Sequence, residues 1–128
     1  MKNQKPGMVF GESEQINQGL DGAALKIGSL NDDLRVRRLG GVVVITDGIA
    51  ALGPSTTTEI ISAITIFDRF TPENDPYGEH DCAVITVSGI KVIWKIDYYD
   101  LTRRYHSRDP SDRNVTSRVM TIMRADEY

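Results

Sequence analysis

Apolar residues recur at helical spacing early in the chain, and a block of β-branched residues follows them. The spacing predicts a helix over about residues 22–38, with Asp21 as its N-cap and Gly40-Gly41 as its end. The block Val42–Thr46 predicts a short strand with apolar side chains on both faces. The predicted helix turns one apolar stripe toward the core, made of Ala23, Ile27, Leu30 and Leu34.

A second helix is predicted after a turn at Asp47-Gly48. Ser55 or Thr56 is placed to cap its N-terminus, and Glu59 stands three residues after Thr56, as in a capping box. Thr71-Pro72 ends the pattern. The apolar residues that we expect on its buried side are Ile60, Ala63, Ile64, Phe67 and Phe70.

Two strand-like runs, Cys82–Val87 and Ile90–Tyr99, flank the dipeptide Ser88-Gly89. A two-residue turn of this kind predicts a β-hairpin in which Val87 pairs with Ile90. This register gathers the large apolar side chains on one face, which we expect to pack against the helices. That face consists of Ala83, Ile85, Val92, Trp94 and Ile96. Trp94 should then be buried near Ile64 and Phe67.

Residues 116–124 alternate between apolar and polar side chains, which favours a strand, although Val119 and Ile122 also fit helical spacing. With the strand, the order of elements predicts one α+β domain over residues 21–128, preceded by a flexible tail at residues 1–20. We expect a sheet of about four strands, mostly antiparallel, with two helices on one face.

The 128 residues carry a net charge of −3, and 40% of them are hydrophobic and 26% charged. This composition fits a soluble globular domain. A slightly acidic chain is not expected to bind nucleic acid strongly without sequence preference, because such binding needs an excess of Lys and Arg. No apolar run is long enough to span a membrane. The single cysteine, Cys82, excludes an internal disulfide and fits a cytoplasmic protein.

The hairpin register also places polar side chains together at the open end of the hairpin. His80 falls opposite Asp97, and Lys95 lies beside Asp97 on the same face. A carboxylate beside an imidazole orients it for general-base catalysis, and a lysine can bind an anionic substrate group. We therefore take His80, Asp97 and Lys95 as candidate catalytic residues. The alternative is a solvated, charge-balanced sheet face.

Two further chemistries involve the same region. Cys82 lies two residues from His80, so a cysteine nucleophile with a histidine base is geometrically feasible, but no oxyanion hole is evident. Carboxylates around His80 offer oxygen ligands, yet their spacing matches no metal motif, so we expect neither a metal nor another cofactor. These carboxylates belong to Asp75, Glu79, Asp81 and Asp97.

Arginines between Arg103 and Arg118 form the main basic concentration of the chain. Guanidinium groups in such a segment bind phosphate or an acidic partner surface, or they pair with carboxylates close by. The neighbouring carboxylates here are those of Asp100, Asp109 and Asp112.

Four motifs in the second half of the chain are long or unusual. They are Asn74-Asp75-Pro76-Tyr77-Gly78-Glu79-His80-Asp81, Trp94-Lys95-Ile96-Asp97-Tyr98-Tyr99-Asp100, Asp109-Pro110 and Thr121-Ile122-Met123. In these motifs the chain resembles a bacterial family known only as a domain of unknown function, over about residues 23–128. The resemblance implies small proteins that are frequent in alphaproteobacteria and on mobile genetic elements. It supplies no known activity, ligand or catalytic residue.

Two functions follow from these observations. The first is a small acidic interaction protein of a mobile element, which binds a protein partner and inhibits a host defence nuclease in the manner of an anti-restriction or anti-CRISPR protein. The second is a small hydrolase or nuclease, metal-dependent or not, that uses the three candidate catalytic residues. We favour the first because no complete catalytic constellation can be assembled, and the oligomeric state stays open. The residues expected to contact the partner are Asp75, Tyr77, Glu79, Asp81, Tyr99 and Asp100.

Overall fold

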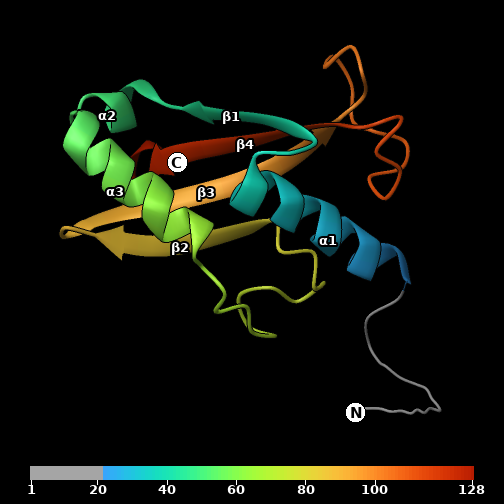
Figure 1. The fold of residues 1–128 in the computed structure, drawn as a ribbon, viewed down its shortest axis with the longest axis horizontal. Coiled ribbons are helices and arrows are strands. Elements are labelled where there is room, and N and C mark those ends of the chain that lie inside the picture. The colour runs from blue at the N-terminus through green and yellow to red at the C-terminus, as the bar shows by residue number, and fades with distance from the viewer. Residues whose placement is uncertain (1–21) are drawn as a thin grey trace.

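Four strands and the helices that cover them make up the fold of residues 22–128, the part of the chain that the computed structural model describes (Figure 1). The predicted N-cap Asp21 and the predicted tail at residues 1–20 lie outside the described residues. The elements are α1 (Gly22–Arg37), β1 (Gly41–Ile45), α2 (Asp47–Ala50), α3 (Pro54–Thr65), β2 (Cys82–Val87), β3 (Ile90–Tyr99), β4 (Ser117–Arg124) and the 3₁₀ helix η1 (Ala125–Glu127).

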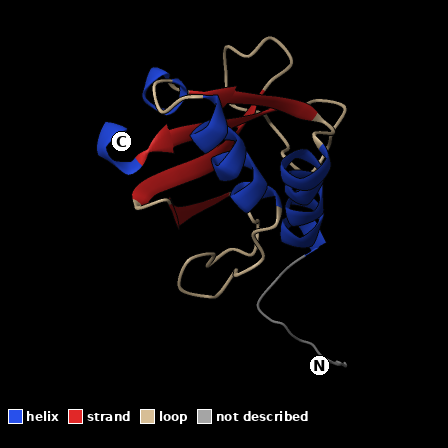
Figure 2. Cartoon of the chain, turned by 60° about the vertical axis from the view of Figure 1, so that its left-hand side comes forward, coloured by secondary structure: helices blue, strands red, loops and turns tan. Residues whose placement is uncertain are grey.

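The sheet has the strand order β1-β4-β3-β2. β1 runs parallel to β4, whereas β4 with β3 and β3 with β2 are antiparallel pairs. Helices α1 and α3 lie across one face of this sheet (Figures 1 and 2). The predicted α+β fold, with four mostly antiparallel strands and helices on one face, is therefore confirmed, as is the strand predicted near the C-terminus.

The hairpin has the predicted register. Val87 pairs with Ile90, and Ala83 pairs with Trp94. Ser88 and Gly89 have φ values of 50° and 77°, which are the positive values that a type I′ turn requires at both central positions. Trp94 is fully buried in the core beneath the helices, and its ring centroid lies 6.1 Å from that of Phe67. The predicted apolar face of the hairpin is thus the face that the helices cover.

The ends of the helices differ from the prediction. α3 begins at Pro54 after Gly53, with no side-chain cap, so the capping box predicted from Thr56 is wrong. Proline is well suited to the first helical position because its fixed φ is helical and its missing N–H is not needed there. α1 ends at Arg37 rather than at the glycines, because Arg38 adopts a left-handed φ of 61° and its N–H bonds back to Leu34 O at 2.9 Å.

The buried face of α1 is more polar than its apolar stripe predicts. Ala23 is exposed, whereas Asn31 and Arg35 are buried together with Ile27 and Leu34. Two polar side chains at consecutive helical turns must find partners inside the protein, because a buried donor without a hydrogen bond is costly. Their partners come from the C-terminal end of α3, the segment between α3 and β2, the sheet and α1 itself, and they build the site described next.

Candidate binding pocket

A half-open pocket of about 480 Å³ lies between α1 and the segment that connects α3 to β2. Its walls combine apolar side chains with a few convergent polar groups, which is typical of ligand sites. The apolar side chains are Leu25, Phe70, Pro72 and Pro76, and the charged or titratable ones are Asp32, Asp75 and His80.

Gly28 allows the connecting segment to approach α1 closely. A Cβ atom at this position would lie 3.0 Å from the carbonyl oxygen of Gly78. One turn further along the helix, the Asn31 Nδ2 atom donates a hydrogen bond of 2.9 Å to the carbonyl oxygen of Glu79. A glycine inside a helix lowers helix stability, and here the contact of the two backbones is its physical reason.

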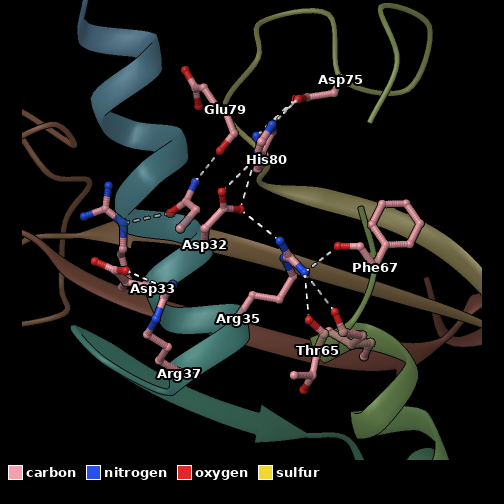
Figure 3. A network of polar contacts seen from close by, with 12 residues as sticks. Asp32, Asp33, Arg35, Arg37, Thr65, Phe67, Asp75, Glu79 and His80 are labelled. Carbon is pink, nitrogen blue, oxygen red and sulfur yellow. Dashed lines mark hydrogen bonds and ion pairs between the residues drawn. The ribbon is translucent and has the colours of Figure 1, made fainter. Parts of the chain in front are cut away.

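His80 is held between two carboxylates at the edge of this pocket (Figure 3). Its Nδ1 atom lies 3.0 Å from Asp32 Oδ1, and its Nε2 atom lies 3.7 Å from Asp75 Oδ2. Since a carboxylate only accepts hydrogen bonds, Nδ1 carries the proton and donates it to Asp32. The ring is stacked on Phe70, with centroids 3.9 Å apart and planes 4° from parallel.

The backbone of His80 is also constrained. Its φ value of 55° lies in the left-handed region, which costs a non-glycine residue roughly 1 kcal/mol or more. The buried carboxylate of Asp75 compensates, because its Oδ1 atom accepts a hydrogen bond of 3.2 Å from the His80 backbone N–H. Asp75 therefore fixes both the backbone and the ring of His80.

Arg35 connects the pocket to the C-terminal end of α3 (Figure 3). Its Nη2 atom donates to Asp32 Oδ1 at 2.9 Å, the same oxygen that faces His80. Its Nη1 atom donates to the carbonyl oxygens of Ile64 at 3.0 Å and Phe67 at 2.7 Å. A cation at a helix C-terminus satisfies carbonyl groups that have no partner within the helix. Asp32 thus balances the charge of the buried Arg35 guanidinium on one side and orients the His80 imidazole on the other.

A second polar cluster lies under the same segment. The Tyr98 hydroxyl donates to Glu79 Oε1 at 2.9 Å and accepts from Asn31 Nδ2 at 2.8 Å. Arg118 Nε donates to Asn31 Oδ1 at 2.8 Å, so the asparagine is satisfied on both sides. Burial, and to a lesser degree the Glu79 carboxylate, raises the pKa of Tyr98 well above its usual value, so this phenol stays protonated. These hydrogen bonds attach Glu79, and with it the segment before β2, to α1 and to β3.

The predicted pairing of His80 with Asp97 is wrong. The antiparallel ladder reaches only as far as Asp81, whose carbonyl oxygen accepts from Ile96 N at 2.7 Å. The left-handed conformation of His80 then turns the chain out of the strand and toward α1. Asp97 instead forms an ion pair with Lys95, whose position in β3 faces away from Trp94 and the helices. The three candidate catalytic residues therefore do not share one site.

The residues predicted to contact a partner are also dispersed. Tyr77 is 76% exposed beside the pocket, but Asp75 is buried. Glu79 faces Tyr98 on the helix side of the sheet, whereas Tyr99, the next residue of β3, points to the opposite side. Asp100 accepts hydrogen bonds from the loop that follows it. These side chains do not form one continuous surface.

The remaining two sequence predictions near His80 concern Asp81 and Cys82. Burial raises the pKa of the Asp81 carboxyl group, and the neighbouring carboxylates of Glu79 and Asp75 add to this effect. Burial and the charge of Asp81 raise the pKa of the Cys82 thiol. A raised pKa lowers the thiolate fraction, so this environment is the opposite of what a nucleophilic cysteine needs.

Within residues 22–128, no three His, Cys, Asp or Glu side chains are grouped closely enough to hold a metal ion. The helices of that part of the chain also include none with the length and apolar character needed to cross a membrane. The polar residues that build the pocket from α1, Asn31, Asp32 and Arg35, were not among the predicted site residues.

A family model described as a protein of unknown function (DUF3768) matches residues 45–127. The chain belongs to this family. The expected resemblance to a domain of unknown function is thereby confirmed. The matched region contains His80 and Asp75, whereas α1 with Asp32 precedes it. No curated protein and no solved structure matches the chain significantly.

Proposed function

We propose that this DUF3768 protein is an interaction protein and that the pocket beside His80 receives a basic side chain of a protein partner. The observation that carries the proposal is the pairing of an exposed carboxylate with an apolar wall. About a third of the Asp32 side chain, 34%, is exposed, although the residue is already oriented by Arg35 and His80. A carboxylate held in this way is ready to accept a further donor at little entropic cost.

The apolar wall fits the stem of such a side chain. Lys and Arg bury their methylene groups along apolar surface while the charged end stays near water or a carboxylate. Leu25, Pro72 and Pro76 offer that surface beside Asp32. The surroundings are acidic as well, since residues 68–81 contain five carboxylates and one arginine. This excess of negative charge attracts a basic partner over several ångströms.

The hydrolase or nuclease alternative has less support. His80 lies on the helix side of the sheet, and Lys95 and Asp97 lie on the other. The Nε2 atom of His80 lies 3.7 Å from the Asp75 carboxylate, so both imidazole nitrogens face carboxylates of the protein itself, which does not suit a general base.

The biological setting of the proposal comes from the family resemblance alone. That resemblance connects the chain with mobile genetic elements of bacteria, and on this ground we propose a cytoplasmic protein whose partner is a nuclease of host defence. Inhibition of a purified restriction or CRISPR nuclease by the full chain tests this part of the proposal.

The pocket itself is tested with a short peptide. We expect acetyl-Gly-Arg-Gly-amide to cause saturable shifts in the backbone amide signals of Ser29, Gly78 and His80 in a ¹⁵N NMR titration. The matched peptide with Gln in place of Arg should leave them nearly unchanged. Asp32→Asn should weaken the binding of the arginine peptide severalfold. Asp33→Asn should leave this binding unchanged, because Asp33 pairs only with the exposed Arg37. Equal responses to the two peptides would contradict the proposal.

A further inference from the structure

The loop between β3 and β4 carries arginines without ion pairs and projects beyond the sheet (Figure 1). Within residues 22–128, Arg104, Arg108 and Arg113 are exposed and lie within ion-pair distance of no carboxylate. Arg103 is also exposed, and its Nε atom donates to Ser117 Oγ at 2.7 Å. The interpretation that these arginines are neutralised by pairing with the aspartates of the loop is therefore wrong.

Those aspartates bind the backbone of the loop instead. Asp100 Oδ1 accepts from the Thr102 hydroxyl at 2.8 Å and from the Arg104 N–H at 3.2 Å. Asp109 Oδ1 accepts from the hydroxyl of Ser111 at 2.6 Å and from its N–H at 3.1 Å. These hydrogen bonds hold the pKa values of both carboxyl groups below their usual range. The carboxylates thus stabilise the loop conformation and leave the guanidinium groups available.

The base of the loop is fixed by buried hydrogen bonds. Ser107 N donates to the carbonyl oxygen of Tyr98 at 3.0 Å. The Ser107 and Thr116 hydroxyl oxygens lie 2.7 Å apart, and Thr116 Oγ1 donates to the carbonyl oxygen of Asp109 at 2.9 Å. A loop that is already ordered loses little conformational freedom on binding. It can therefore act as a preformed surface.

Large exposed side chains stand among these arginines. Leu101 is 66% exposed and Tyr105 is 69% exposed. Arg and Tyr are enriched among the residues that contribute most to protein interfaces, because they combine large contact area with specific hydrogen bonds. The loop therefore has the composition of a binding surface as well as an excess of positive charge.

We propose that residues 101–113 bind an acidic segment of a protein partner, whose carboxylates form ion pairs with the guanidinium groups of Arg104 and Arg108. Carboxylates and guanidinium groups form two parallel charge-assisted hydrogen bonds. A protein ligand is favoured over nucleic acid because Leu101 and Tyr105 offer exposed contact area beside the arginines. Strong binding of a phosphate backbone draws instead on an excess of Lys and Arg, and this chain carries a net charge of −3. The proposal does not depend on the His80 pocket, because none of the residues lining that pocket belongs to the loop.

The experiment uses the full chain and a fluorescent peptide of ten glutamates. We expect salt-sensitive binding, measured by fluorescence anisotropy, that weakens at least about tenfold in the double variant Arg104→Gln/Arg108→Gln. Both side chains are exposed and make no hydrogen bond within residues 22–128, so the variant should fold normally, which thermal melting checks. The control Arg69→Gln/Lys91→Gln removes two exposed positive charges elsewhere and should change binding less than about twofold.

Three outcomes would overturn the proposal. One is the absence of glutamate-peptide binding at low salt. Another is equal weakening in the loop variant and in the control, which would mean that only net charge matters. The third is tighter binding of a ten-nucleotide oligothymidylate than of the peptide under the same conditions, which would assign the loop to nucleic acid.

Discussion

The Nδ1 atom of His80 lies 3.0 Å from the Oδ1 atom of Asp32, a residue 48 positions earlier in the chain. The same oxygen accepts from Arg35, which in turn donates to the carbonyl groups at the end of α3. One carboxylate thereby connects α1, the end of α3 and the segment before β2. The stability of the fold and the shape of the pocket should both depend on it.

Asp32→Asn should lower the free energy of unfolding by about 1–3 kcal/mol. The substitution leaves a buried guanidinium without its counter-ion, and it replaces one of the two carboxylate oxygens that face the imidazole by an NH2 group that cannot accept. Asp33→Asn is the matched control on the next residue, because Asp33 forms only an i,i+4 pair with the exposed Arg37. Its expected effect is below about 0.5 kcal/mol. Urea unfolding compares the two variants directly. Equal losses in the free energy of unfolding would mean that the contacts of Asp32 with Arg35 and His80 do not stabilise the fold.

Gly28→Ala should destabilise the protein by about 1 kcal/mol, although the same change usually stabilises a helix. The added methyl group would meet the carbonyl oxygen of Gly78 at 3.0 Å, and the hydrogen bond from Asn31 to Glu79 restrains that segment. Gly22→Ala is the control, since nothing lies within 4 Å of a Cβ atom there. It should be neutral or slightly stabilising. Thermal melting that shows a gain for both variants would contradict the close approach.

Trp94→Ala should cost about 3–5 kcal/mol, enough to unfold many domains of this size. The side chain is fully buried and packs edge-to-face against Phe67 and Phe70, with centroids 6.1 and 6.2 Å away. Tyr105→Ala, at a side chain that is 69% exposed, should change stability by less than about 0.5 kcal/mol. A small shift in the urea midpoint for the tryptophan variant would show that the helix-covered face has been assigned to the wrong side.

The local elements follow from the sequence because local rules decide them. Ser88-Gly89 adopts the turn that such a dipeptide favours, and the turn fixes the register from Cys82 to Lys95. The register fails at His80 because the Asp75 carboxylate accepts a hydrogen bond from the His80 backbone N–H and so stabilises a backbone conformation that the residue type alone disfavours. A contact of this kind cannot be found from the alternation of strand residues.

The site was missed for a related reason. Asn31 and Arg35 continue the spacing of four residues that begins at Ile27, so they lie on the buried stripe of α1. Polar side chains on a helix usually face solvent, and only the tertiary partners of Asn31 and Arg35 explain why these two are buried. The parallel pairing of Val42 with Val119 is likewise set by packing between distant segments and not by either strand's own residues.

The pH dependence of stability should differ between two aspartates whose carboxyl groups are shifted in opposite directions. The pKa of Asp81 is raised in the fold, so ionisation of this group costs stability as the pH rises through its folded value. Asp81→Asn should therefore stabilise the protein at pH 7 and have little effect near pH 3, below the unfolded pKa of about 3.9.

The pKa of Asp109 is lowered in the fold, so its contribution is present above the unfolded pKa and is lost as the pH falls through the folded value. Asp109→Asn should then destabilise the protein at pH 7 and not at low pH. Urea unfolding of the wild type and both variants between pH 3 and 7, a range that spans the reference value, tests the two signs together. A change in stability at pH 7 of the same sign for both variants would contradict the environments described for these groups.

A basic side chain that enters the pocket beside His80 comes close to the side chains lining it, so intermolecular NMR contacts reveal its position. With the acetyl-Gly-Arg-Gly-amide peptide bound to isotope-labelled protein, we predict nuclear Overhauser contacts from the arginine methylene protons to the methyl groups of Leu25 and to the ring of Phe70. Asp32→Asn should remove them. The absence of contacts with the pocket at saturating peptide would contradict this position of the arginine side chain. Contacts to the loop at residues 101–113, or to Val84 on the open face of the sheet, would contradict it as well.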